Sequence, residues 1–233
     1  MNSNFEFFLF TDANIRYVAL GSVLLSAISA MVGTFTFLDK KSLMGDAIAH
    51  AILPGICLGF LVSGTKNPWF LIAGAFVTGW LSIYAIEQIT SKTRIKEDTA
   101  IGLILSVFFG IGVLMLTAIQ KSGNASQSGL DQFIFGKAAA MIGQDLIVFF
   151  IVAVFLLLAV WLLFKEFTLI AFDKDFAAAI GLNVRIIRMV LTSLVVLAVV
   201  IGIQAVGVVL MAAMLITPAA AASPYSYFLN IVK

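Results

Sequence analysis

The sequence predicts an all-α fold: a polytopic helical membrane protein with about seven transmembrane helices in a single domain, residues 1–233. Of these residues, 62% are hydrophobic and 11% are charged, whereas soluble domains carry roughly 25% charged residues. Nearly uncharged runs of about 20 residues, long enough as helices to cross the hydrocarbon core of a bilayer, recur along the whole chain. A water-soluble domain of this size could not bury so much apolar surface.

The apolar runs give the spans in order. Five lie at about 17–37, 43–63, 68–89, 99–119 and 143–164. The stretch from Met189 to Ala222 is also uncharged. It is too long for one perpendicular helix and long enough for two short ones, with a turn near Gly202, Gln204 and Gly207. The count is therefore seven, or six if this last stretch is one tilted or broken helix.

Basic residues in the loops predict the orientation. Lysine and arginine concentrate in the alternate loops 38–42, 90–98 and 165–188, which the positive-inside rule places in the cytoplasm. These residues are Lys40, Lys41, Lys92, Arg94, Lys96, Lys165, Lys174, Arg185 and Arg188. The opposite side holds only Arg16, Lys66, Lys121 and Lys137. We expect the N-terminus outside, and the net charge of +2 is too small to indicate a nucleic-acid partner.

One segment, 45-GDAIAHAILPG-55, carries ionisable groups inside a predicted span. Asp46 and His50, the only histidine, are four residues apart, so a helix places both side chains on one face. Ionisable groups within a membrane are costly and generally functional, and a carboxylate with a neutral imidazole suits a divalent transition metal. The pair fits a metal site in a permeation path or, equally by spacing, a polar contact between packed helices. Pro54 cannot donate an amide to the carbonyl of His50, which predicts a bend beside the histidine.

The segment 92-KTRIKEDTAIGLILS-106 runs from a charged loop into the fourth span. Glu97 and Asp98 fall at the expected helix start, where carboxylates complement the helix dipole, and Thr99 could add a capping hydroxyl. By residue chemistry this is foremost a well-capped cytoplasmic turn. The alternative is a docking surface for a cytoplasmic partner.

The loop 165–188 is the longest of the cytoplasmic set. Asp173 can cap a short helix from Lys174 to Ile180, and Gly181 suits its C-terminal end. Apolar residues exposed on this helix would form a contact with a partner. The alternative is an interfacial helix that lies on the lipid surface.

Four ordered segments resemble the permease subunits of bacterial ABC importers for zinc, manganese and iron(II), the metal ABC-3 permease family. They are GDAIAHAILPG, the R-x-K-E-D-T-A-I-G stretch at Arg94 to Gly102, the loop FDKDFAAAIGLNV at Phe172 to Val184, and 207-GVVLMAAMLITPAAAA-222. The resemblance implies that Asp46 and His50 bind the transported ion. It also implies that the short cytoplasmic helix is a coupling helix that docks an ATPase, with the residues Asp173, Asp175, Phe176, Ala178, Ala179 and Gly181.

The resemblance further implies the partners. In such importers two permeases pair in a bacterial cell membrane, cytoplasmic ATP-binding subunits dock on their coupling helices, and an extracytoplasmic metal-binding protein delivers the ion. This chain has no G-x-x-x-x-G-K-[ST] phosphate loop, so we expect no enzyme activity of its own, and ATP is bound by the partner. A second copy or a paralogue would complete the coordination shell that one Asp–His pair leaves open.

No permanently bound cofactor is expected, because the metal is the cargo. The oxygen and nitrogen donors suit manganese(II), iron(II) or zinc(II), and manganese is favoured because 129-GLDQFIFGKAA-139 looks more like manganese and iron members than zinc ones. Family members generally continue beyond the TPAAAA segment with a further membrane segment, whereas this chain turns to SPYSYFLNIVK. The C-terminal membrane segment of the family is therefore expected to be missing.

Three other functions compete with the importer. An intramembrane metalloenzyme could hold zinc with the same pair, but H-E-x-x-H is absent, and one histidine and one cysteine, Cys57, are few for a catalytic or structural zinc site. An ATP-independent cation channel or carrier could use the same two residues. A non-transporting remnant of a permease is the third.

Overall fold

The protein is described here by a computed structural model that covers residues 13–39, 43–65, 67–121, 136 and 143–231. Every regular element in these ranges is a helix, which confirms the all-α prediction. The helices are α2 (Ala13–Leu38), α3 (Met44–Ala51), α4 (Leu53–Ser63), α5 (Pro68–Lys92), α6 (Glu97–Lys121), α8 (Gly143–Leu162), α9 (Phe164–Phe172), α10 (Lys174–Ala179), α11 (Val184–Val206) and α12 (Val208–Ile231). Lys40, Lys41, Lys66, Lys137 and most of 129–139 lie outside the described residues.

The predicted spans correspond in order to α2, α3 with α4, α5, α6, α8, α11 and α12. Five of these units are long and apolar enough to cross a membrane. A sixth would be the bent pair of α8 and α9, which meet at 61°. The apolar part of α12, Val208–Ala222, is shorter. The chain is thus a polytopic helical membrane protein, and the predicted count of seven includes one short apolar helix.

Two boundaries differ from the prediction. The loop 165–188 is largely helical, because α9 occupies Phe164–Phe172 and α11 begins at Val184. Charged residues such as Lys165 and Arg185 suggested a loop, but charges do not end a helix that continues beyond the apolar layer. The turn in the last uncharged stretch lies at Gly207 alone, where φ is +83° and glycine is favoured.

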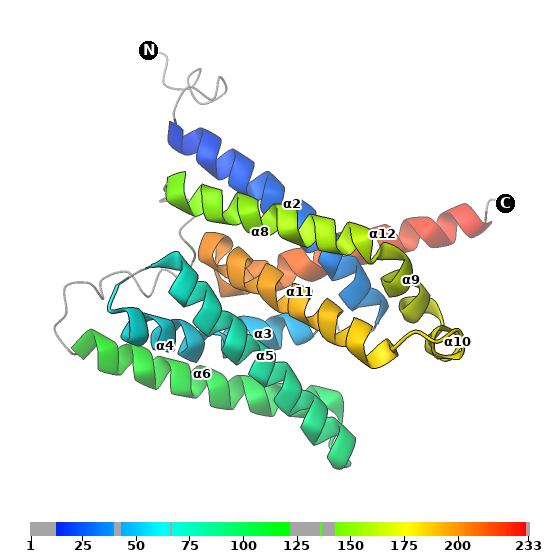
Figure 1. Cartoon of the computed structure of the whole chain (residues 1–233), viewed down its shortest axis with the longest axis horizontal. Helices are drawn as coiled ribbons and strands as arrows, with labels where there is room; N and C mark the ends of the chain where they lie inside the picture. The colour runs from blue at the N-terminus through cyan, green and yellow to red at the C-terminus, as the bar shows by residue number, and fades with distance from the viewer. Residues whose placement is uncertain (1–12, 40–42, 66, 122–135, 137–142, 232–233) are drawn as a thin grey trace.

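The helices pack as two groups that share a buried centre (Figure 1). In one group α4 lies between α5 and α6; in the other α2 contacts α8 and α12. The unit Met44–Ser63 contacts both groups, and 72% of the residues in its apolar stretch are buried, against 28–50% in the other four long spans. The segment that carries Asp46 and His50 is therefore the most internal of the spans.

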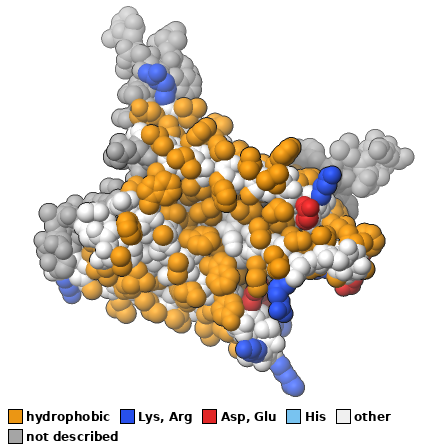
Figure 2. Space-filling model, viewed as in Figure 1, with side chains coloured by type: hydrophobic (Ala, Val, Ile, Leu, Met, Phe, Trp, Pro, Cys, Tyr) orange, Lys and Arg blue, Asp and Glu red, His pale blue; other side chains and the backbone are white. Residues whose placement is uncertain are grey.

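The outer surface is mostly hydrophobic. Figure 2 shows a face covered by apolar side chains, with the few charged ones mainly toward its margins. Large residues such as Phe150, Phe155 and Trp161 on α8 are more than half exposed. This surface suits contact with lipid rather than with water.

Glycines allow α4 and α5 to approach closely. A Cβ atom at Gly55 would collide with the carbonyl oxygen of Gly74, and one at Gly59 would collide with that of Phe70. Gly55 and Gly59 are one helical turn apart, which is the small-xxx-small pattern of tightly packed membrane helices. The two backbones therefore touch along the C-terminal half of the span that holds the Asp–His pair.

Candidate functional site

Asp46 and His50 lie on one face of α3. His50 Nε2 is 3.6 Å from Asp46 Oδ1, as the four-residue spacing predicts. The side chain of Asp46 is 44% exposed and that of His50 is 25% exposed. A carboxylate this open within an apolar span requires a polar surrounding, such as an aqueous path or a facing subunit.

The imidazole has an unused polar atom. His50 Nδ1 is buried and has no hydrogen-bond partner among the described residues. The ring makes a T-shaped contact with Phe109 of α6, with ring centroids 5.1 Å apart and planes at 89°. Phe109 thus packs against the ring, while neither ring nitrogen has a hydrogen bond from the described residues. The alternative was a polar contact between packed helices. In the described part of the chain no other helix supplies a hydrogen-bond partner for His50.

The distance within the pair fits a single bridging ion. Bonds of about 2.1 Å place two ligand atoms roughly 3.0 Å apart at a right angle and roughly 3.4 Å apart at the tetrahedral angle. The 3.6 Å between Asp46 Oδ1 and His50 Nε2 is close to that range. Within the described residues no group of three or more His, Cys, Asp or Glu side chains could hold a metal. The described part of one copy therefore offers two side-chain ligands at this pair and leaves the shell open.

The helix is interrupted directly after His50. α3 ends at Ala51, α4 begins at Leu53, and Pro54 occupies the first turn of α4. The amides of Ile52 and Ile56 still bond to carbonyls four residues earlier, so the path of the chain continues through the break. Pro54 has no amide proton to donate to the carbonyl of His50, so the helix is loosened beside the histidine, where the interruption lies.

The short helix in 165–188 is α10. Asp173 Oδ1 accepts hydrogen bonds from the amides of Asp175 and Phe176, at 3.1 and 2.9 Å, and so caps its start. Gly181 follows its end at φ +91°, and the amides of Gly181 and Leu182 bond back to Ala178 and Ala177. These contacts give the helix two firm ends in spite of its short length.

Three large apolar residues in and beside α10 form an exposed apolar stripe. Phe172 at the end of α9, Phe176 in α10 and Ile180 just after α10 are 78%, 54% and 56% exposed. Ala177, on the other side, is completely buried. Ala178 and Ala179 are exposed as well, as are Asp173 and Asp175. The protein therefore presents an unpartnered apolar stripe at one end, framed by acidic residues.

The structure gathers the predicted cytoplasmic loops at this same end. One open cavity is lined by residues from loop 90–98 and from 165–188, including Ser91, Glu97, Lys174 and Arg185. An ion pair between Lys174 and Asp39 adds the loop that follows α2. Asp39 was not singled out from the sequence, because its partner is distant along the chain and only the fold brings the two together. Phe109 likewise gave no signal, since it lies in an apolar run.

Comparison with known proteins gives a family match over nearly the whole chain. The model of the ABC 3 transport family matches residues 11–232. A solved structure, PsaBC from Streptococcus pneumoniae in complex with Fab, is similar with a TM-score of 0.82 and 33% sequence identity. The similarity covers 96% of this chain and 77% of that chain.

Relatives give the same assignment at higher identity. The manganese transport system membrane protein MntC of Bacillus subtilis (strain 168) is 50% identical over 206 residues, which are 88% of this chain and 47% of that protein. The zinc transport system membrane protein TroC of Treponema pallidum (strain Nichols) is 41% identical over 224 residues, 96% of this chain and 75% of that protein. The chain thus spans about half the length of the first relative and three quarters of the second.

Proposed function

This chain belongs to the ABC 3 transport family, and we propose that it is the membrane permease subunit of an ATP-binding-cassette importer that carries a divalent transition metal ion into the cytoplasm of a bacterial cell. The family match supports the class of protein. The observation that carries the cargo assignment is the Asp46–His50 pair, 3.6 Å apart in the most buried span. The ATPase would be a separate subunit, since the chain has no phosphate-binding loop.

The donor set supports the class of ion. A carboxylate oxygen and an imidazole nitrogen together favour manganese(II), iron(II) or zinc(II) over calcium and magnesium, which prefer oxygen ligands alone. Manganese is favoured among these, because the relative at 50% identity is named for manganese transport, while that at 41% is named for zinc. A site with few ligands also releases its ion readily, as a transport site must.

A second permease copy or a paralogue would complete the site. The side chain of Asp46 is 44% exposed, and the described part of one copy supplies two ligands at this pair. A facing Asp–His pair, with water, would give a full shell. The delivery of the ion would fall to an extracytoplasmic binding protein, with the N-terminus of the permease on that outer side.

The helix α10 would couple ATP hydrolysis to transport. The apolar stripe of Phe172, Phe176 and Ile180 suits a hydrophobic pocket on a cytoplasmic subunit. The caps of α10 hold the helix together, so that it can move as a rigid unit. Closure of the ATPases would move α10 and switch the permeases between outward-facing and inward-facing arrangements.

Metal uptake by the reconstituted complex tests the proposal. The chain, its ATPase and its binding protein would be placed in vesicles and supplied with manganese, zinc or iron(II). We expect accumulation that requires ATP and is fastest for manganese. Uptake that proceeds without ATP would instead indicate a channel or carrier, and failure to accumulate any of the three ions would contradict the assignment.

Shortening one side chain of the stripe tests the docking role of α10. Phe176→Ala removes a large apolar group that is 54% exposed. If it fills a socket, the loss should weaken ATPase binding by about 3–5 kcal/mol at most, the range for a fully buried phenylalanine. The dissociation constant of the permease and ATPase in detergent is the measurement.

The matched control is Phe150→Ala in α8, because this phenylalanine is equally exposed, at 55%, but lies in the predicted span 143–164 and away from α10. It should leave the dissociation constant unchanged. Equal affinities for the wild type and Phe176→Ala would place the ATPase contact elsewhere.

A further inference from the structure

An ion pair joins the end of α2 to the start of α10. Lys174 Nζ lies 2.8 Å from Asp39 Oδ1. The carboxylate is only 10% exposed, whereas the lysine is 47% exposed. Because the Asp39 carboxylate is shielded from solvent, opening the pair leaves a buried charge that requires another partner.

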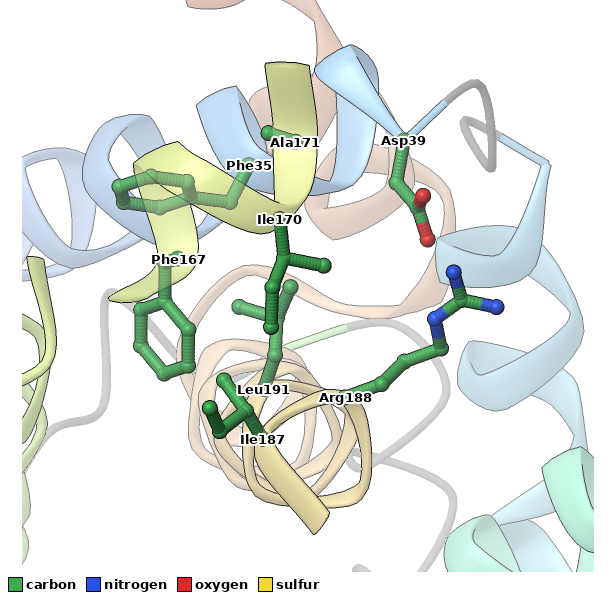
Figure 3. A pocket seen from close by; sticks show the side chains of 8 residues that line it. All are labelled: Phe35, Asp39, Phe167, Ile170, Ala171, Ile187, Arg188 and Leu191. Atoms are coloured by element: carbon green, nitrogen blue, oxygen red, sulfur yellow. The ribbon is translucent and has the colours of Figure 1, made fainter. Parts of the chain in front are cut away.

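A second cation stands beside the same carboxylate. Figure 3 shows the guanidinium of Arg188, from α11, directed toward Asp39. Both residues line the same two small cavities, together with Leu191. Arg188 Nε is buried and has no hydrogen-bond partner among the described residues. A buried donor of this kind is costly until it finds an acceptor.

The carboxylate is also incompletely satisfied. Although Lys174 Nζ is close to Asp39 Oδ1, this oxygen accepts no well-directed hydrogen bond from the described residues. Lys174 therefore holds it by charge attraction, and the oxygen remains open to a guanidinium. The buried carboxylate of Asp39 thus has two cations nearby, Lys174 on α10 and Arg188 on α11.

We propose that Asp39 exchanges between Lys174 and Arg188 and so links the position of the coupling helix α10 to that of α2; this rests on the function proposed above for α10. When α10 moves away from α2, the pair with Lys174 opens. The buried carboxylate then pairs with Arg188, whose free donor makes the second arrangement favourable. The exchange is a two-state element, which a coupling mechanism requires.

Packing connects α2 to the metal site. A Cβ atom at Gly33 of α2 would collide with the carbonyl oxygen of Leu215 in α12, and one at Gly45 would lie 2.6 Å from a methyl group of the same leucine. Gly45 directly precedes Asp46. Leu215 is 1% exposed and fills the space between the two glycines. A shift of α2 would therefore move Leu215 against the backbone that carries Asp46.

A distance measurement on the purified permease tests the exchange without any transport. Spin labels at Leu38→Cys and Ile180→Cys, both exposed positions, report the separation of α2 and α10. Lys174→Gln and Asp39→Asn should lengthen this distance, while the control Lys165→Gln should leave it unchanged. If the distance is the same in all four proteins, the exchange is wrong, whatever the complex transports.

Coupling in the reconstituted complex is the second test. Asp39→Asn, Lys174→Gln and Arg188→Gln should each reduce the number of metal ions moved per ATP hydrolysed by about fivefold or more, the lower range of allosteric coupling. Arg185→Gln, an exposed arginine one turn earlier on the same helix, is the control and should keep the wild-type ratio. A normal ratio in Arg188→Gln would overturn the exchange.

A charge swap separates exchange from a fixed ion pair. The double variant Asp39→Lys with Lys174→Asp restores an opposite-charge pair between α2 and α10, but it sets the new lysine against Arg188. A purely structural bridge would be rescued in both the spin-label distance and the transport ratio. Exchange predicts that the distance recovers while the ratio stays low, and recovery of both would overturn it. A wild-type complex without any uptake would contradict the proposed function, and the distances would still decide the exchange.

Discussion

Replacing Asp46 or His50 by alanine should abolish metal accumulation or reduce it at least tenfold. On the proposed function, each change would remove one of the two side-chain ligands of α3, and the remaining ligand would hold a divalent ion poorly in an apolar span. Loss of about 1.4 kcal/mol of binding free energy already lowers occupancy tenfold at subsaturating metal. The measurement is accumulation of manganese in cells that depend on this importer, with protein level and ATPase association monitored in parallel.

The control for both variants is Thr117→Ala in α6. Among the described residues its hydroxyl bonds only to the carbonyl of Val113 in its own helix, 2.8 Å away, so its removal changes a polar group in a span without touching the site. It should transport normally. Normal uptake in both Asp46→Ala and His50→Ala would refute the assignment of these residues as ligands.

A methyl group at Gly55 should strongly destabilise the fold, because it would force apart two helices whose backbones touch. In Gly55→Ala the Cβ atom would overlap the carbonyl oxygen of Gly74 and the hydroxyl of Thr78, so α4 and α5 must separate. Overpacking costs about 1–3 kcal/mol where side chains can adjust. Here one of the colliding atoms belongs to the backbone, so the upper end is expected. Thermal unfolding of the purified protein in detergent is the measurement.

Gly102→Ala and Gly110→Ala in α6 are the matched controls. A Cβ atom at either position has no neighbour within 4 Å. Alanine is the better helix former by about 1 kcal/mol, so these variants should be as stable as the wild type or slightly more so. Equal stability of Gly55→Ala and the controls would mean that α4 and α5 are less closely packed than described.

The spans could be predicted from the sequence because a bilayer sets the length of every apolar run. The same argument misplaced the helix ends near Lys165 and Arg185, because a helix that leaves the apolar layer needs no apolar residues to continue. The break near Pro54 could be predicted because proline has no amide proton to donate to the preceding turn of the helix. The structure places the break at Ile52, two residues before Pro54.

The candidate site was only partly visible in the sequence. Asp46 and His50 stand out because charged groups are rare in apolar helices, and their spacing defines one face. Asp39 and Arg188 do not stand out, since single charges at the ends of spans are common and their proximity depends on tertiary packing. The contact of Phe109 with His50 also depends on how α3 and α6 pack.

The proline after the histidine has a consequence for ion selectivity. Because Pro54 has no amide proton, the backbone oxygen of His50 lacks its normal helical donor. It lies on the same residue as the imidazole and is a neutral oxygen, the ligand type that manganese accepts more readily than zinc. In the proposed site, such an oxygen would favour the harder ion, so Pro54 would influence the choice of ion without binding it.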